Sequence, residues 1–133
     1  MTIQVLDSID LWDQQFAGVI LTPLGFGDGV VEENTQPDRI VLMHEGTTAL
    51  QRGYVAHWAV RGRELWLVAV HGRLRLRGGQ PVPAEWVQAE MRVGIGAPPD
   101  ELHDRYAGNY AQQIRLVVDE GLVESAWRME RLM

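Results

Sequence analysis

The sequence predicts an all-β, predominantly antiparallel domain, a sandwich or partly closed barrel built on a three-stranded meander at residues 53–77. Three observations carry this prediction. Apolar and polar residues alternate through the meander, and the pairs Arg61-Gly62 and His71-Gly72 interrupt the alternation at hairpin spacing. Further alternating segments follow at 85–95 and 112–131. Short helical turns are expected only in the loops.

Length and composition bound the kind of protein. The 133 residues fit one β-rich domain, 1–133. The chain has no cysteine, which removes disulfides, thiolate chemistry and cysteine-based metal sites. No apolar run approaches the ~20 residues that span a bilayer, and the N-terminus carries acids where a secretory signal has basic residues. We therefore expect a cytoplasmic protein.

The net charge of −6 is unevenly distributed along the chain. Residues 1–45 carry eight acids against one arginine, whereas residues 46–97 carry seven arginines against three glutamates. The chain has twelve arginines and no lysine, a preference that a GC-rich genome explains as readily as a need for bidentate cations. A basic middle third therefore lies within an acidic chain.

The segments before the meander predict two strands and a long loop. Residues 1–22 suit a strand, a turn and a second strand, although the spacing of their large apolar residues also suits one helical face. Residues 24–37 are rich in glycine and acids and predict an exposed loop. Residues 39–43 form a short strand candidate that leads toward the meander.

Pairing residues across the two predicted turns assigns each side chain of the meander to one of two faces. The expected core face consists of Tyr54, Ala56, Trp58, Val60, Leu65, Leu67, Ala69, Leu74 and Leu76. On the other face His57 is expected opposite Trp66, together with Val55, Val70 and three arginines. This mixture of apolar and basic residues resembles the centre of a protein interface. We define the candidate interaction face as His57, Trp66, Val68, Arg73, Arg75 and Arg77.

The segments after the meander complete the predicted sheet. Residues 78–83 contain two glycines and two prolines and predict a wide turn. Residues 85–95 alternate as a strand, and 96–110 predict a second long loop with one helical turn at 100–106. The chain closes with a hairpin that turns at Glu120-Gly121.

Three stretches of the chain carry a resemblance. Thr48–Trp58 (TALQRGYVAHW), Leu65–Leu67 and Val70-His71-Gly72 are similar to a family of small bacterial β-rich proteins with a TxLxRGYxAxW…LxL…VxG pattern. The likeness covers about residues 47–123, with Ala59 where the family usually has an acid. The resemblance implies the same β-rich fold and no function, because the family has no established activity.

The sequence contains no residue pattern with the spacing or context of a known metal site or nucleotide-binding site. The histidines, His44, His57, His71 and His103, match no local zinc motif. The GxGxG stretch at residues 25–29 is acidic and is not followed by a clear helix, which argues against a phosphate site. We expect no cofactor and no metal.

Patterns that could carry catalysis or nucleic-acid binding are equally incomplete. Residues 100–104 gather three acids and an imidazole, but the only serines, Ser8 and Ser125, are far from them in sequence. The arginine stripe of the candidate interaction face lies in an acidic protein, which argues against nucleic acid. We expect no catalytic set.

These observations favour a non-catalytic binding or interaction protein that uses the outer face of the 53–77 meander. A protein partner or a second copy of the chain is expected, and neither nucleic acid nor a membrane is. One alternative is an inhibitor or immunity-type accessory protein of a mobile or competitive genetic element, suggested by small size and acidity. Another is a small enzyme or ligand-binding barrel with a pocket lined by His57, His103 or Glu101.

Overall fold

The computed structural model describes residues 7–13, 15–22, 24–35, 53–95 and 112–130. Its strands are β1 (Ser8–Leu11), β2 (Phe16–Ile20), β3 (Val31–Glu33), β4 (Tyr54–Arg61), β5 (Glu64–Gly72), β6 (Leu74–Leu76), β7 (Val82–Pro83), β8 (Ala89–Ile95), β9 (Gln112–Asp119) and β10 (Leu122–Glu130), with a 3-10 turn η2 (Arg77–Gly79). In these ranges no helix has the length and apolar character to cross a membrane.

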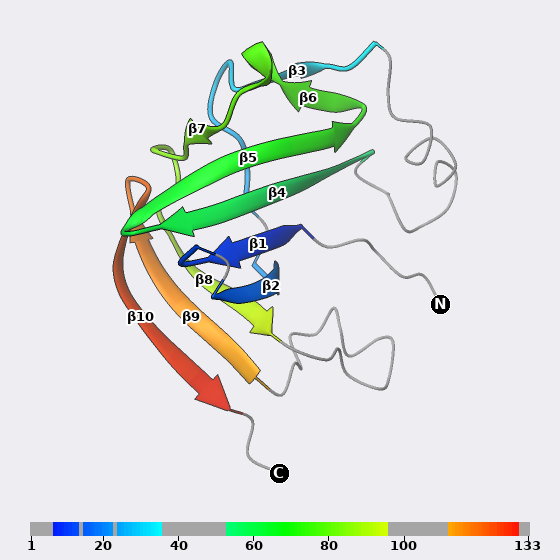
Figure 1. The fold of residues 1–133 in the computed structure, drawn as a ribbon. Helices are drawn as coiled ribbons and strands as arrows, with labels where there is room; N and C mark the ends of the chain where they lie inside the picture. The colour runs from blue at the N-terminus through cyan, green and yellow to red at the C-terminus, as the bar shows by residue number, and fades with distance from the viewer. Residues whose placement is uncertain (1–6, 14, 23, 36–52, 96–111, 131–133) are drawn as a thin grey trace, which may run out of the picture.

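Seven of the described strands form one sheet that closes on itself (Figure 1). The order is β10-β9-β8-β2-β1-β4-β5, and β10 pairs with β5 to complete the barrel. Neighbours are antiparallel except β1 and β4, which are parallel. Strand β7 extends the sheet beside β5, and β3 and β6 form a separate small sheet above it. The predicted all-β fold and the barrel architecture are confirmed.

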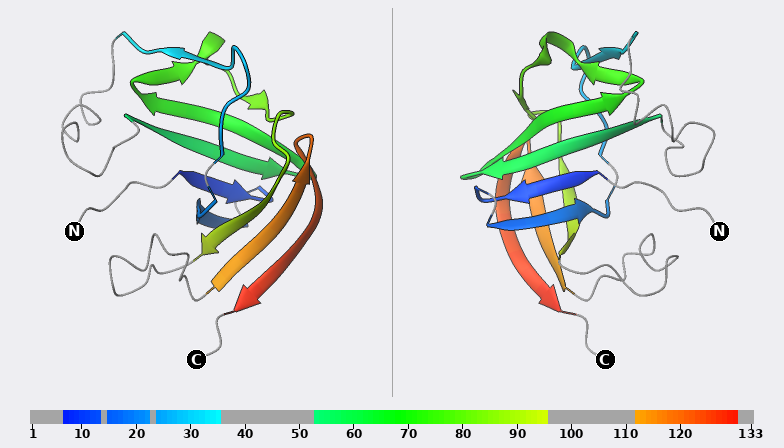
Figure 2. Two further views of the ribbon diagram at one scale, coloured as in Figure 1. Left: turned by 180° about the vertical axis from the view of Figure 1, so that it is seen from behind. Right: turned by 45° about the vertical axis from the view of Figure 1, so that its right-hand side comes forward.

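The seam of the barrel is short. A single residue pair, Leu122 and Glu64, joins β10 to β5. Two backbone hydrogen bonds support it, from the Leu65 N–H to the Gly121 carbonyl at 2.8 Å and from the Val123 N–H to the Arg63 carbonyl at 2.7 Å. Beyond this point β5 and β10 diverge, as the rear and oblique views show (Figure 2). The barrel is therefore tightly closed at one end only.

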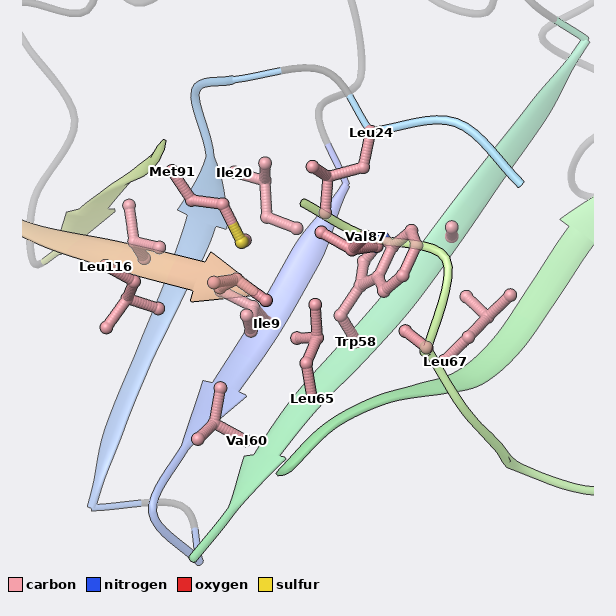
Figure 3. Close-up of a cluster of buried hydrophobic side chains, with 14 of the residues drawn as sticks. Ile9, Ile20, Leu24, Trp58, Val60, Leu65, Leu67, Val87, Met91 and Leu116 are labelled. Carbon is pink, nitrogen blue, oxygen red and sulfur yellow. The ribbon is translucent and has the colours of Figure 1, made fainter. Parts of the chain in front are cut away.

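The inner faces of the strands form the hydrophobic core (Figure 3). The largest fully buried side chains are those of Trp58, Ile9, Leu11, Leu65, Leu67, Met91, Leu116, Val60, Val93 and Val118. Trp58 is the largest of them, and the rings of Phe26 and Trp86 each lie 6.3 Å from it, centroid to centroid. The tryptophan predicted to face the core is thus at its centre.

The turn of the first meander hairpin differs from the prediction. Arg61 pairs with Glu64, so the turn residues are Gly62 and Arg63 instead of Arg61 and Gly62. Gly62 has a φ of 60° and is the first turn residue. Glycine at this place is typical of a type II′ turn, whereas the prediction assumed a type I′ turn with glycine second.

The changed turn preserves the predicted core face near the turn. Trp58 pairs with Leu67 instead of Leu65, a shift of two residues. Because side chains alternate with a period of two, such a shift leaves each of them on its own face. The predicted core residues that are fully buried are Ala56, Trp58, Val60, Leu65 and Leu67.

A bulge changes the two faces farther from the turn. The pairing shifts between Trp58 and His57, so that Val68 is the extra residue of β5 and His57 pairs with Ala69. The prediction that His57 lies opposite Trp66 is therefore wrong. Val70 was predicted on the outer face and is buried instead, because the bulge inverts the alternation of β5.

The third strand of the predicted meander leaves the sheet. His71 and Gly72 are the last residues of β5 and do not form the predicted hairpin turn. Strand β6 then pairs with β3, with Arg75 opposite Glu32. The predicted pairing of this strand with β5 is wrong, because the acidic segment before the meander supplies a partner strand that bears the opposite charge.

The remaining elements follow the prediction with two exceptions, the loop expected at 24–37 and the wide turn expected at 78–83, in which β7 pairs with β5. The strand, turn and strand expected within 1–22 are β1 and β2, and the closing hairpin turns at Glu120-Gly121. The expected loop at 24–37 instead contains β3 and the buried Leu24. The strand expected at 39–43 and the helical turn at 100–106 lie outside the described residues.

We expect truncation of the two central tryptophans to have unequal effects. Trp58→Ala should lower the free energy of unfolding by about 3–5 kcal/mol, because it removes a fully buried ring. Trp66→Ala should cost about 1 kcal/mol, because this half-buried ring has an Arg61 guanidinium over it at 5.8 Å. Urea unfolding followed by circular dichroism measures both. A larger loss for Trp66→Ala would contradict the assignment of the faces.

Two turn glycines provide a matched pair for the seam. Gly121 has a φ of +80°, and a Cβ there would lie 2.7 Å from the Ala84 carbonyl oxygen. Gly62 has a φ of +60° with open space around it. Gly62→Ala should therefore cost only the backbone strain of about 1–2 kcal/mol, and Gly121→Ala should cost more. Equal losses in thermal or urea unfolding would argue against the close approach at the seam.

Candidate functional site

The structure divides the candidate interaction face between two places. His57 and Trp66 lie on the outer surface of the barrel, on β4 and β5. Val68 and Arg75 line a pocket at the edge of β5. The last two predicted residues, Arg73 and Arg77, are exposed and flank β6. The predicted residues therefore belong to two neighbouring surfaces.

On the outer surface, His57 lies between two polar side chains of β1. The parallel register places Ser8 beside His57 and Asp10 beside Ala59. The Ser8 Oγ lies 2.5 Å from the His57 Nδ1, and the Asp10 Oδ2 lies 3.0 Å from the His57 Nε2. The side chains of His57 and Asp10 are 30% and 27% exposed. We refer to Ser8, Asp10 and His57 as the His57 cluster.

The cluster fixes the roles of the two imidazole nitrogens. A carboxylate can only accept hydrogen bonds, so a neutral ring must carry its proton on Nε2, toward Asp10. The Nδ1 is then an acceptor and receives the Ser8 hydroxyl proton. This order of hydroxyl, imidazole and carboxylate is that of a nucleophile, a base and a group that orients the base.

Two members of the cluster, Ser8 and Asp10, were not predicted from the sequence. They alternate with the buried Ile9 and Leu11, which is a readable sign that they share the outer face of β1. Their partner lies 49 positions from Ser8 in sequence. No local pattern could have indicated a parallel pairing over that separation.

A small pocket lies beside the His57 cluster. It has a volume of about 250 Å³ and is lined by Asp10, Asp13, Ala59, Val60 and Arg61. Asp13 belongs to the tight turn between β1 and β2, where it has a φ of 57°. The pocket therefore presents two carboxylates and one guanidinium.

A larger pocket lies at the edge of β5. It has a volume of about 440 Å³ and is lined by Val68, Ala69, Val70 and His71 of β5 and by Arg75, Leu76, Gly78 and Gly79. Strand β7 pairs only with Trp66 and Leu67. Across the part of the chain that the structure describes, the edge of β5 from Val68 to Val70 has no strand partner. We refer to this region as the β5-edge pocket.

The β5-edge pocket has a basic lining, and the carboxylate of Glu32 partly neutralises its positive charge. Arg75 donates from Nε and Nη2 to the Glu32 Oε2, at 2.9 and 2.6 Å. The Arg77 Nε lies 4.0 Å from the other oxygen of the same carboxylate. The residues that line the pocket include Arg75 and His71 and no acid. Glu32 therefore holds Arg75 in place beside the pocket from outside its lining.

No metal site emerges from the described ranges. Within them, no group of three histidine, aspartate or glutamate side chains has an arrangement that could hold a metal ion. A third pocket of about 670 Å³ lies at the seam and includes Glu64, Glu85 and Glu120. His44, His103 and Glu101, which are candidates from the sequence, lie outside the described residues.

Comparison with known proteins adds no assignment: no family model, no curated protein and no solved structure matches this chain. The functional conclusions therefore rest on the geometry of the two surfaces.

We expect the neutral His57 ring to carry its proton on Nε2. The Asp10 carboxylate accepts from that nitrogen, so the Nε2–H tautomer should dominate in alkaline buffer. Long-range ¹H–¹⁵N correlation spectra distinguish the two tautomers, and exposed His71 provides an internal reference. A dominant Nδ1–H pattern for His57 would contradict the arrangement.

Proposed function

We propose that this chain is a binding protein that takes an extended segment of a protein partner as an added strand at the β5-edge pocket. The observation that carries the proposal is an edge of β5 that no other described strand pairs with, beside a pocket with a basic lining. Edge strands present free N–H and C=O groups that pair with an extended peptide. The proposed site keeps Val68 and Arg75 of the candidate interaction face and leaves out His57 and Trp66.

The backbone of β5 supports strand addition. In an antiparallel ladder, successive residues direct their N–H and C=O groups alternately to opposite sides. The Arg73 N–H bonds to the Gly53 carbonyl at 2.8 Å, which places the bonds to β4 at residues 73, 71 and 69. Val70, beyond the bulge, therefore directs its backbone groups to the open side, where a partner strand would lie.

The lining favours a partner segment that carries an acid. In the described structure, the Arg75 Nη1 has no hydrogen-bond partner, while Nε and Nη2 are held by Glu32. A carboxylate of the partner can pair with this preorganised guanidinium by a charge-assisted hydrogen bond. The chain as a whole is acidic, with a net charge of −6. Non-specific attraction of anions is thus disfavoured, and specificity would come from the local pocket.

We place the protein in the cytoplasm, on the grounds of its lack of long apolar runs. We also propose membership of the small bacterial family that carries the TxLxRGYxAxW pattern, supported by Thr48–Trp58.

The proposal is tested by selection from a display library of random ten-residue segments on the full chain. Enriched segments should alternate apolar residues and contain Asp or Glu. Arg75→Gln should weaken their binding about tenfold, the effect of losing one hydrogen bond to a charged group. Arg63→Gln is the matched control, because Arg63 is also exposed and paired with an acid, Glu124, at 3.5 Å.

Hydrogen exchange locates the bound segment. The amide of Val70 should become protected when an enriched peptide binds, whereas those of β10 beyond Ser125 should not change. Failure to enrich any segment, or equal binding to Arg75→Gln and Arg63→Gln with no protection at β5, would overturn the proposed function.

A further inference from the structure

We infer that Ser8 is a nucleophilic serine that accepts an acyl or phosphonyl group, with His57 as its base and Asp10 as the residue that positions His57. This activity is independent of peptide binding, because the His57 cluster lies on the outer surface of the barrel and outside the lining of the β5-edge pocket. The order and the distances of the three side chains carry the inference.

The sheet holds the cluster in a fixed geometry. Ser8 and Asp10 project from the same face of β1, two residues apart, and His57 projects between them from the neighbouring strand. Its two ring nitrogens are occupied at 2.5 Å and 3.0 Å, so rotation of the ring would break both contacts. Sites built on strands position their groups more accurately than sites on loops.

The cluster has the functional order of a catalytic triad with the two ring nitrogens exchanged. In the Ser-His-Asp template the base nitrogen is Nε2 and the orienting carboxylate meets Nδ1. Here Nδ1 faces the hydroxyl and Nε2 faces the carboxylate. Either imidazole nitrogen can accept a proton while the other donates, so the exchange preserves the chemistry.

The surroundings of Ser8 allow access. Ser8, Asp10 and His57 are all partly exposed, and the register places the half-buried Val19 beside Ser8. The only other serine of the chain is Ser125, on the outer strand β10, where its side chain is exposed. Ser125 has no histidine beside it in the paired strand, where its partner is Val117. It is therefore an internal control.

An alkyl fluorophosphonate would react with Ser8 by substitution at phosphorus. The Ser8 Oγ attacks phosphorus, the O–P bond forms, and the P–F bond breaks with departure of fluoride. The hydroxyl proton passes to the His57 Nδ1 and from there to water, so the covalent product is a neutral phosphonate ester on Ser8. With an activated ester, the same proton transfer accompanies formation of the acyl ester and loss of the alcoholate.

The sheet also limits the rate of ester turnover. Strand β1 is paired on one side by β2 and on the other by β4, so its backbone N–H groups are used within the sheet. A group that stabilises the developing oxyanion is usually the largest contribution to acyl-transfer rates. We therefore expect Ser8 to be labelled stoichiometrically and to turn over esters slowly.

The test is labelling of the full chain with a fluorophosphonate probe, followed by intact mass and peptide mapping. One equivalent should attach to Ser8, and Ser8→Ala should abolish it. His57→Gln should slow labelling about 100-fold, the lower part of the range for general-base assistance. Ser125→Ala should leave the labelling rate unchanged.

Asp10 is tested as a positioning residue. Asp10→Asn removes the carboxylate that favours the Nε2–H tautomer, so labelling should slow about tenfold while the tautomer pattern of His57 shifts toward Nδ1–H. Circular dichroism confirms that each variant is folded. A purely structural role would change stability without changing the tautomer.

Two results would overturn the inference. Labelling of Ser8 no faster than that of Ser125 would show that its hydroxyl is not activated. Equal labelling of the folded wild type and the folded His57→Gln variant would show that His57 is not its base.

Discussion

The parallel pairing of β1 with β4 is the interaction on which the rest of the barrel depends. It joins the N-terminal hairpin to the hairpin of β4 and β5, and β2 then pairs with β8 to bring in the C-terminal strands. Its start is fixed by Asp7, a buried carboxylate whose Oδ1 accepts the Ala56 N–H at 2.9 Å. A buried N–H without such a partner would be destabilising by about 1–3 kcal/mol. The same pairing sets Ser8 and Asp10 on either side of His57.

The bulge at Val68 is the second structural feature on which the proposed function depends. Before the bulge β5 has neighbours on both sides, and after it the strand keeps β4 alone among the described strands. The bulge also turns Val70 inward, which seals the core beneath the open edge. The side chain of Val70 thus contributes to the core, while the backbone edge of the same strand remains open to a partner strand in the proposed complex.

Local patterns in the sequence were sufficient for the seven strands of the barrel and insufficient for their partners. The β-rich class, the closing hairpin at Glu120-Gly121 and the burial of Trp58 follow from alternation and turn chemistry. The first turn was misplaced by one residue, because a single glycine suits either position of a two-residue turn depending on its type. The pairing of β6 with β3 and of β1 with β4 joins residues about 40–50 positions apart, a separation over which alternation predicts no register. For this reason His57 was recognised as a candidate, while Ser8 and Asp10 were not.

The short seam between β5 and β10 gives the folded protein a latent weakness. Few backbone bonds span it, so it is where local opening requires the least free energy. Opening would release two strand edges at once, and free edges of different molecules can pair and aggregate. The net charge of −6 opposes such encounters, since like-charged molecules repel one another at low ionic strength. The net negative charge of this chain therefore protects against aggregation a barrel whose closing strand pair is short.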